Sequence, residues 1–250
     1  MSDVVTYRLE SDIGVIAIDN PPVNALGHAV REGLLAALDK GLADGSARAL
    51  VIIGAGRTFP AGADIKEFGQ TPKEPSLPEV IDRIEAADKL TIAAVHGTAL
   101  GGGMEVTLGC DYRVATADAR MGLPEVNLGL LPGAGGTQRL PRLIGQSRAM
   151  DLVLTGREVG TDEALEIGLA NRRAEAGGAL EAAKALARDI AGFPQVCMRT
   201  DRASVLSQWG LDEQAALRAE IEGGIKVIET GETQAGATRF KSGSGRHGKF

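Results

Sequence analysis

The chain has 250 residues, of which 44% are hydrophobic and 24% charged, and this length suffices for one large domain with a sizeable core or for two small ones. Its formal net charge of −6 argues against nucleic acids and anionic membranes as partners, because both are bound through basic surfaces. Cys110 and Cys197 lack metal-ligand spacing, and no apolar segment resembles a signal peptide or a membrane span, so we expect a cytoplasmic protein without a metal site.

The first half of the chain alternates between strand and helix patterns. In chain order, we expect a strand over residues 14–20, a helix over 28–45, a buried strand over 47–56, a helix over 77–90 and a strand over 91–97. This alternation predicts right-handed βαβ units with a mainly parallel sheet, and therefore an α/β fold.

Beyond about Pro141 the patterns are helical, and they suggest a small subdomain or an interface. The helical patterns occupy residues 147–156, 160–170, 179–192, 195–209 and 211–231. We therefore divide the chain into an α/β core, residues 1–190, and a helical C-terminal region, residues 191–250.

The segment "LGGGMEVTLGC", Leu100 to Cys110, places a carboxylate, Glu105, in an apolar and helical pattern directly after three glycines. A buried carboxylate costs several kcal/mol unless it is paired, hydrogen-bonded or protonated. Glu105 is therefore either a functional group or a residue on a solvated face of the helix, and this segment alone does not distinguish the two.

A second carboxylate, Glu125, occurs among apolar residues in "MGLPEVNLGLLPGAGGTQRLP". This segment ends in a predicted helix start at Thr137, whose backbone amides would face a substrate or water. Two neighbouring carboxyl groups do not easily ionise together, so Glu105 and Glu125 would form an acid/base pair. The alternative for Glu125 is a solvated carboxylate in a turn.

A third segment, "FPAGADIKEF", surrounds Gly62 with the small residues Ala61 and Ala63. If its amides face those of the glycine triplet, main-chain N–H groups would form an oxyanion hole. The alternative is a strand-to-helix turn in which small residues serve only packing.

Together these segments resemble the crotonase superfamily, the enoyl-CoA hydratase/isomerase fold. The resemblance extends from about Tyr7 to at least Arg173 and includes, in family order, "NPPVNAL", "AGADIKEF", "HGTALGGGMEVTLGCDYRVA" and "GLPEVNLGLLPGAGGTQRLPRLIG". The chain looks most like the hydratase half of the multifunctional β-oxidation enzymes. The resemblance implies a crotonase-like ββα spiral core with a helical C-terminal region used in oligomerisation.

The resemblance also implies roles for individual residues. Glu105 and Glu125 match the catalytic glutamates, and Ala63 and Gly102 match the positions whose N–H groups form the oxyanion hole. The implied reaction is hydration of a short- or medium-chain trans-2-enoyl-CoA, with no separate cofactor because coenzyme A is part of the substrate. The residues implied in substrate binding are Ala61, Asp64, Ile65, Lys66 and Gly133.

Family members assemble as trimers or dimers of trimers, so we expect residues 191–250 to serve trimerisation and to cover the active site. Lys66, Lys241 and Arg246 are candidates for binding the phosphates of coenzyme A. Two features depart from the family pattern: Pro60 precedes the "AGAD" turn, and the tail "FKSGSGRHGKF" replaces a basic helix.

Two alternatives remain open at the level of sequence. The first is an enoyl-CoA isomerase or another enzyme that forms a thioester enolate, although the isomerases that resemble this family keep a single acid where this chain has two. The second is a binding or scaffold protein that retains the fold without turnover, against which both glutamates and the acidic balance argue.

Overall fold

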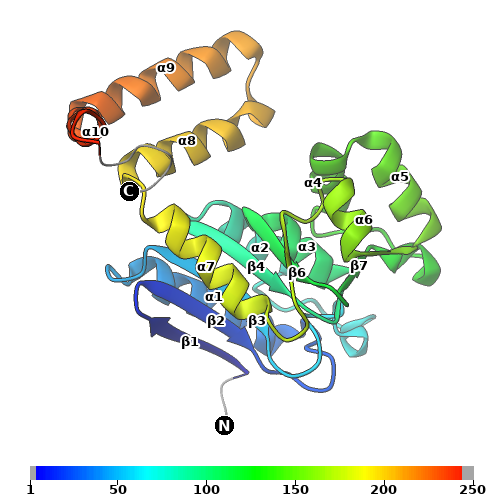
Figure 1. The fold of residues 1–250 in the computed structure, drawn as a ribbon. Coiled ribbons are helices and arrows are strands. Elements are labelled where there is room, and N and C mark those ends of the chain that lie inside the picture. Colours follow the sequence, from blue (N-terminus) through cyan, green and yellow to red (C-terminus); the bar gives the residue numbers. More distant parts are fainter. Residues whose placement is uncertain (1–3, 244–250) are drawn as a thin grey trace. The chain divides into compact units, whose positions relative to one another are not determined.

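The computed structural model describes residues 4–243, and the chain divides between residues 187 and 188 into two compact units (Figure 1). We call residues 1–187 unit 1 and residues 188–250 unit 2. Each unit is described below by itself.

Unit 1 is built on a six-stranded sheet with the strand order β1-β2-β3-β4-β6-β9. Its neighbouring strands are parallel, apart from the antiparallel pair at the β1 edge. The strands are β1 (Val5–Glu10), β2 (Ile13–Ile18), β3 (Ala49–Gly54), β4 (Leu90–Val95), β6 (Tyr112–Thr116) and β9 (Arg172–Ala174). The sequences "IGVIAI", "ALVIIG" and "LTIAAV" are almost continuously apolar, because central parallel strands are covered on both faces.

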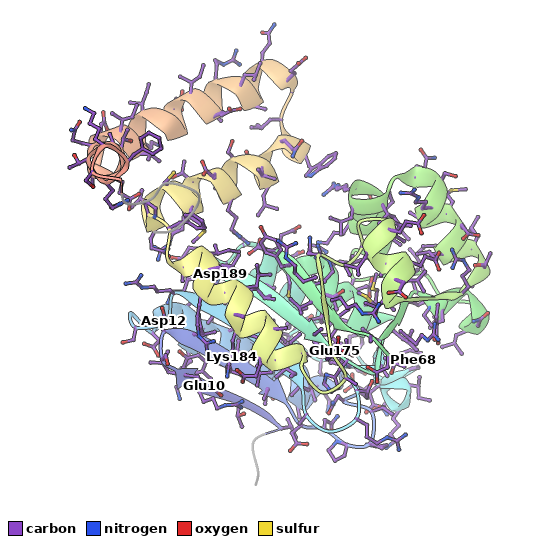
Figure 2. The ribbon with its side chains drawn as sticks, in the orientation of Figure 1. Glu10, Asp12, Phe68, Glu175, Lys184 and Asp189 are labelled. Carbon is purple, nitrogen blue, oxygen red and sulfur yellow. The ribbon has the colours of Figure 1, made fainter. Side chains whose placement is uncertain are left out.

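Helices cover both faces of this sheet. Figure 1 shows α1 (His28–Ala43), α2 (Leu77–Glu85) and α3 (Gly102–Gly109) on one face, and the first part of α7 (Ala179–Ala191) on the other. On the α7 side, Lys184 Nζ lies 2.6 Å from Glu10 Oε2 at the end of β1, and Figure 2 labels this pair. The core between the layers is made of fully buried branched side chains such as Ile16, Ile52 and Ile81.

A smaller three-stranded sheet completes unit 1. It consists of β5 (Thr98–Leu100), β7 (Arg120–Gly122) and β8 (Glu158–Gly160), with β5 parallel to β7 and β8 antiparallel to it. Three short helices belong to this part of the chain: α4 (Gly136–Ile144), α5 (Gln146–Thr155) and α6 (Thr161–Glu166). Two 3₁₀ helices, η1 (Ile65–Glu67) and η2 (Pro124–Leu128), occupy the connections that matter for the site below.

The described part of unit 2, residues 188–243, is helical. It contains the end of α7, α8 (Gln195–Ser207), the 3₁₀ helix η3 (Gln208–Gly210), α9 (Glu213–Glu229) and α10 (Glu232–Lys241). The Glu232 carboxylate at the start of α10 accepts hydrogen bonds from the Val196 and Cys197 amides at the start of α8. Asp212 caps α9 in the usual way, accepting from the Ala215 amide at 2.8 Å.

The expected elements of the first half are present with shorter bounds. The helix expected over 77–90 ends at Glu85, and β4 begins already at Leu90. Ser76 and Glu79 form a capping box, so α2 begins at Leu77, where the sequence predicts it. Strand β1 is additional to the expected set, and its antiparallel pairing with β2 makes it the exception in an otherwise parallel sheet.

Candidate active site

The three chemistry-bearing segments meet where strands β5 and β7 end. These strands are parallel, with Leu100 opposite Gly122, and the Gly101 amide donates to the Gly122 carbonyl at 2.9 Å. The residues that follow each strand therefore leave the same edge of the sheet. On one side they enter α3, and on the other they enter η2 with Glu125. Ligand sites in α/β folds commonly form at such carboxyl ends of parallel strands.

The glycine triplet lets the backbone at the start of α3 approach neighbouring main chain closely, because no side chains intervene. Gly101 has φ of +51°, in the region that favours glycine. A Cβ at Gly103 would lie 1.7 Å from the Pro60 carbonyl oxygen, so only glycine fits there. Pro60, which departs from the family pattern, therefore presents its carbonyl directly against the first turn of α3.

The "AGAD" turn packs against this first turn. Its conformation is fixed by main-chain bonds, in which the Ala61 amide donates to the Val23 carbonyl and the Leu26 amide donates to the Gly62 carbonyl. The Ala63 nitrogen lies 3.4 Å from the place that a Cβ on Gly102 would occupy. Within the described chain, neither the Ala63 N–H nor the Gly102 N–H has an acceptor. Two free main-chain donors thus lie close together, Ala63 exposed and Gly102 buried.

Glu105 is buried in α3, with only 3% of the residue exposed. The interpretation of Glu105 as a residue on a solvated face is therefore wrong. Its Oε1 accepts hydrogen bonds from the Ala134 amide at 2.7 Å and from the Gly136 amide at 2.9 Å. Burial raises the pKa of Glu105, while these two amides and the charge of Arg139 oppose the rise. The site thus holds a buried carboxylate whose ionised form has two donors.

Glu125 has a different environment. It is partly buried in η2, its Oε1 lies 3.2 Å from the place of a Cβ on Gly101, and its Oε2 is buried without a hydrogen-bond partner in the described chain. Burial, with a smaller contribution from the negative charge of Glu105, raises the pKa of Glu125 from 4.5 to about 7. The two carboxyl groups therefore differ in compensation: Glu105 has two amide donors for its ionised form, whereas burial lets Glu125 retain its proton up to near neutral pH.

The predicted substrate-binding residues lie along the "AGAD" turn and η1. Asp64 caps η1 by accepting from the Lys66 amide at 3.0 Å. Ile65 is 67% exposed, and Lys66 is exposed beside it. Gly133 is exposed in the turn before α4. Lys241 is an exposed residue at the end of α10 in unit 2, whereas Arg246 lies outside the described residues.

The sequence prediction for the amides near Thr137 needs a correction. Helix α4 begins at Gly136 rather than Thr137, and the Ala134 and Gly136 amides point to Glu105 instead of an open site. The physical reason is that the side chain of Glu105, buried opposite this turn, presents a carboxyl oxygen as a strong acceptor for them.

Sequence reasoning also missed Arg139, whose guanidinium contacts this turn. Arg139 Nη1 donates to the Ala134 carbonyl at 3.1 Å, and Arg139 Nη2 lies 2.7 Å from both Asp82 Oδ1 and Glu85 Oε2 on α2. The signal in the sequence is an arginine in the first turn of a helix, where the helix dipole favours acidic residues.

The described residues 4–243 lack two kinds of feature. No group of three or more His, Cys, Asp and Glu side chains there has the arrangement to hold a metal ion. Nor does any helix within those residues combine the length and apolar character needed to cross a membrane.

Comparison with known proteins defines the class. The model of the enoyl-CoA hydratase/isomerase family matches residues 8–244, so the chain belongs to this family. This confirms the resemblance found in the sequence.

Individual proteins that the chain resembles are consistent with this family membership. The chain is 48% identical over 170 residues to the peroxisomal bifunctional enzyme of Danio rerio, a match covering 68% of this chain but 24% of that relative. It is 42% identical over 197 residues to a probable enoyl-CoA hydratase of Bacillus subtilis, covering 76% of each. Among solved structures, the enoyl-CoA hydratase of Mycobacterium tuberculosis superimposes with a TM-score of 0.91 at 32% identity, covering 97% of both chains. The expected crotonase-like α/β fold is thereby confirmed.

Proposed function

We propose that the chain is an enoyl-CoA hydratase, a lyase that adds water across the double bond of a trans-2-enoyl-CoA through a thioester enolate. Membership of the family supports this, as does the name of the Bacillus subtilis relative. The observation that carries the proposal is the pair of carboxyl groups, Glu105 with two amide donors and Glu125 with a buried oxygen that has no partner in the described chain, next to two free main-chain N–H groups.

The Ala63 and Gly102 amides would bind the carbonyl oxygen of the thioester. Polarisation of that carbonyl makes C3 electrophilic, and the negative charge that collects on the oxygen during addition is stabilised by both donors. Loss of one such donor typically costs about 10²–10³ in rate. The close approach of the two amides depends on the absence of side chains at Gly102 and Gly103.

The two glutamates divide the proton transfers. Glu105, the carboxylate with two amide donors, accepts a proton from the water as its oxygen bonds to C3. Glu125, whose pKa of about 7 leaves it about half protonated at neutral pH and mostly protonated below it, donates its proton to C2 of the enolate. The water thus supplies the hydroxyl group at C3, and Glu125 supplies the hydrogen at C2. Transfer to Glu125 of the proton that Glu105 took from the water then restores the starting state.

The other expectations stay proposals. We propose acyl-CoA as the substrate without a further cofactor, contacts to the coenzyme A moiety from Ala61, Asp64, Ile65, Lys66 and Gly133, and a cytoplasmic location. We also propose that residues 191–250 serve trimerisation and cover the active site.

The test is the reaction of the purified protein with crotonyl-CoA, followed by the ultraviolet absorbance of the conjugated thioester. We expect the absorbance to fall with the wild type, and the rate to drop at least about 10²-fold in Glu105→Gln and in Glu125→Gln, since each removes an acid/base group. Glu166→Gln, on an exposed residue of α6, is the matched control and should keep the wild-type rate.

Either of two results would contradict the proposal. Wild-type rates in both glutamine variants would exclude the two-glutamate mechanism. Conversion of a 3-enoyl-CoA without net uptake of water, together with no loss of crotonyl-CoA, would identify an isomerase.

A further inference from the structure

The Glu105 carboxylate depends on a turn that is short and rich in glycine. Residues 133–136 read "GAGG", and Gly135 has φ of +103°. Such a turn has little stiffness of its own because glycine has many accessible conformations. Nevertheless it presents two amides, those of Ala134 and Gly136, to the same oxygen of Glu105. Something outside the turn must restrain it.

Arg139 is the side chain that packs on the turn. Besides its bond to the Ala134 carbonyl, its Nη1 lies 2.0 Å from the place that a Cβ on Gly135 would occupy, so the guanidinium fills the space that glycine leaves. Its side chain is 11% exposed. A guanidinium buried to this extent requires compensation by charge and hydrogen bonds.

That compensation comes from α2. Glu85 accepts from Arg139 Nε at 3.2 Å and from Nη2 at 2.7 Å, which is the two-pronged geometry typical of arginine and carboxylate, and Asp82 accepts from Nη2 at 2.7 Å. The guanidinium is therefore anchored on one side to α2 and on the other to the turn. A continuous chain of bonds runs from α2 through Arg139 and Ala134 to Glu105.

We propose that Arg139 is a positioning residue for Glu105: anchored by Asp82 and Glu85, it fixes the 134–136 turn so that the Ala134 and Gly136 amides stay directed at the carboxylate. Its consequence for turnover rests on the proposed function, but its effect on Glu105 does not. The charged groups in electrostatic contact with Glu105 are Arg139 on α4 and Glu125 on η2, and the two α2 carboxylates act on it through Arg139.

The decisive variant is the double substitution Asp82→Asn with Glu85→Gln. In this variant the change of charge and the loss of positioning shift the pKa of Glu105 in opposite directions. Removal of two negative charges would by itself lower the pKa of Glu105. Loss of the anchor would loosen the turn and weaken two amide bonds to the ionised carboxylate, which raises the pKa of Glu105. We expect a rise of about 0.5 to 1, measured by ¹³C NMR titration of the glutamate carboxyl carbons with Glu105→Gln identifying the signal.

Arg139→Lys keeps the positive charge but lacks the planar fork that holds Glu85 and Ala134 together. We expect the same upward change in the pKa of Glu105 and a fall in kcat of about tenfold with KM within about twofold, as for a group that acts on the transition state. The control is Arg157→Lys: Arg157 also pairs with two carboxylates, Asp151 and Glu163, at a surface position.

A lowered or unchanged pKa of Glu105 in the double variant, with circular dichroism showing a folded chain, would overturn the proposal. Because Asp82 and Glu85 are partly exposed, this variant is expected to fold even if Arg139→Lys does not. If the wild type fails to hydrate crotonyl-CoA, the proposed function fails, while the NMR titration still decides the role of Arg139.

Discussion

At the level of single residues, Glu105 and Glu125 are the same chemical group in two environments. Both are withdrawn from water, which raises the pKa of each. Glu105 is compensated by two amides, whereas the buried Oε2 of Glu125 has no partner in the described chain. An enzyme that must both take up and deliver a proton needs this asymmetry, since two equal carboxyl groups would compete for one role.

The unpartnered oxygen of Glu125 has a thermodynamic consequence. Its pKa is raised in the folded state to about 7, so between about pH 4.5 and 7 the folded protein keeps a proton that the unfolded chain releases. The free energy of unfolding of the wild type therefore falls as pH rises through this interval. Glutamine does not titrate, so Glu125→Gln should be more stable than the wild type at about pH 8 and equal to it near pH 4.5.

A pKa change of that size corresponds to at most about 3.4 kcal/mol, and the partial exposure of Glu125 reduces the expected gain to about 1 kcal/mol. In thermal unfolding this amounts to a Tm higher by about 2–4 °C at alkaline pH. If Glu125→Gln gained the same stability near pH 4.5 as at about pH 8, the substitution would act through packing rather than through loss of the titrating proton.

At the level of secondary-structure elements, α3 is fixed at both ends. Its first turn lies against Pro60 through Gly103, and its last carbonyls accept from the buried guanidinium of Arg113, which donates to Thr107 O at 3.0 Å and Cys110 O at 2.9 Å. The same guanidinium reaches Leu169 O through Nε at 2.7 Å. A helix held this way keeps the Gly102 amide and Glu105 in a constant relation to the sheet.

The close contact between Gly103 and Pro60 predicts the effect of adding one methyl group at position 103. Gly103→Ala would place Cβ 1.7 Å from the Pro60 carbonyl oxygen and 2.6 Å from its carbon, so α3 and the "AGAD" turn must separate. We expect a loss of at least about 2–3 kcal/mol in the free energy of unfolding, and a large loss of hydration rate because the two amide donors no longer converge.

The control for this prediction is Gly45→Ala in the turn after α1, where a Cβ meets no atom within 4 Å and φ is not positive. It should leave stability unchanged or raise it by up to about 1 kcal/mol. Far-ultraviolet circular dichroism is the suitable probe in urea, because the single tryptophan, Trp209, lies in unit 2. Equal stabilities of the two alanine variants would contradict the argument.

The elements themselves were largely predictable from the sequence, and the contacts between them were not. Apolar runs such as residues 49–54 identify central strands, and the alternation of Val5, Tyr7 and Leu9 with polar residues indicates β1, which the expected set lacked. The glycine and glutamate motifs predicted the candidate site through family resemblance. Arg139, however, acts through Asp82 and Glu85, which precede it by 57 and 54 residues, and no local pattern connects them.

At the level of the whole molecule, both units expose large apolar side chains, and in unit 2 some of these form a row along one helix. Along α9, four large apolar side chains are at least half exposed: Leu217, Ile221, Ile225 and Ile228 are 53%, 64%, 50% and 62% exposed. Their spacing of three or four residues places them in one row on the helix. A row of this kind on a protein surface commonly marks an interface.

We therefore expect the assembly proposed for residues 191–250, a trimer or a dimer of trimers, to bury this row. Ile221→Glu combined with Ile225→Glu should dissociate the assembly, because each glutamate would be buried without a partner. Sedimentation velocity on the full chain measures this directly. Lys226→Glu, an exposed position on the same helix outside the row, introduces the same residue type and should leave the assembly intact. A wild type that sediments as a monomer would refute the assembly, and a double variant that retains the wild-type mass would show that α9 does not form the interface.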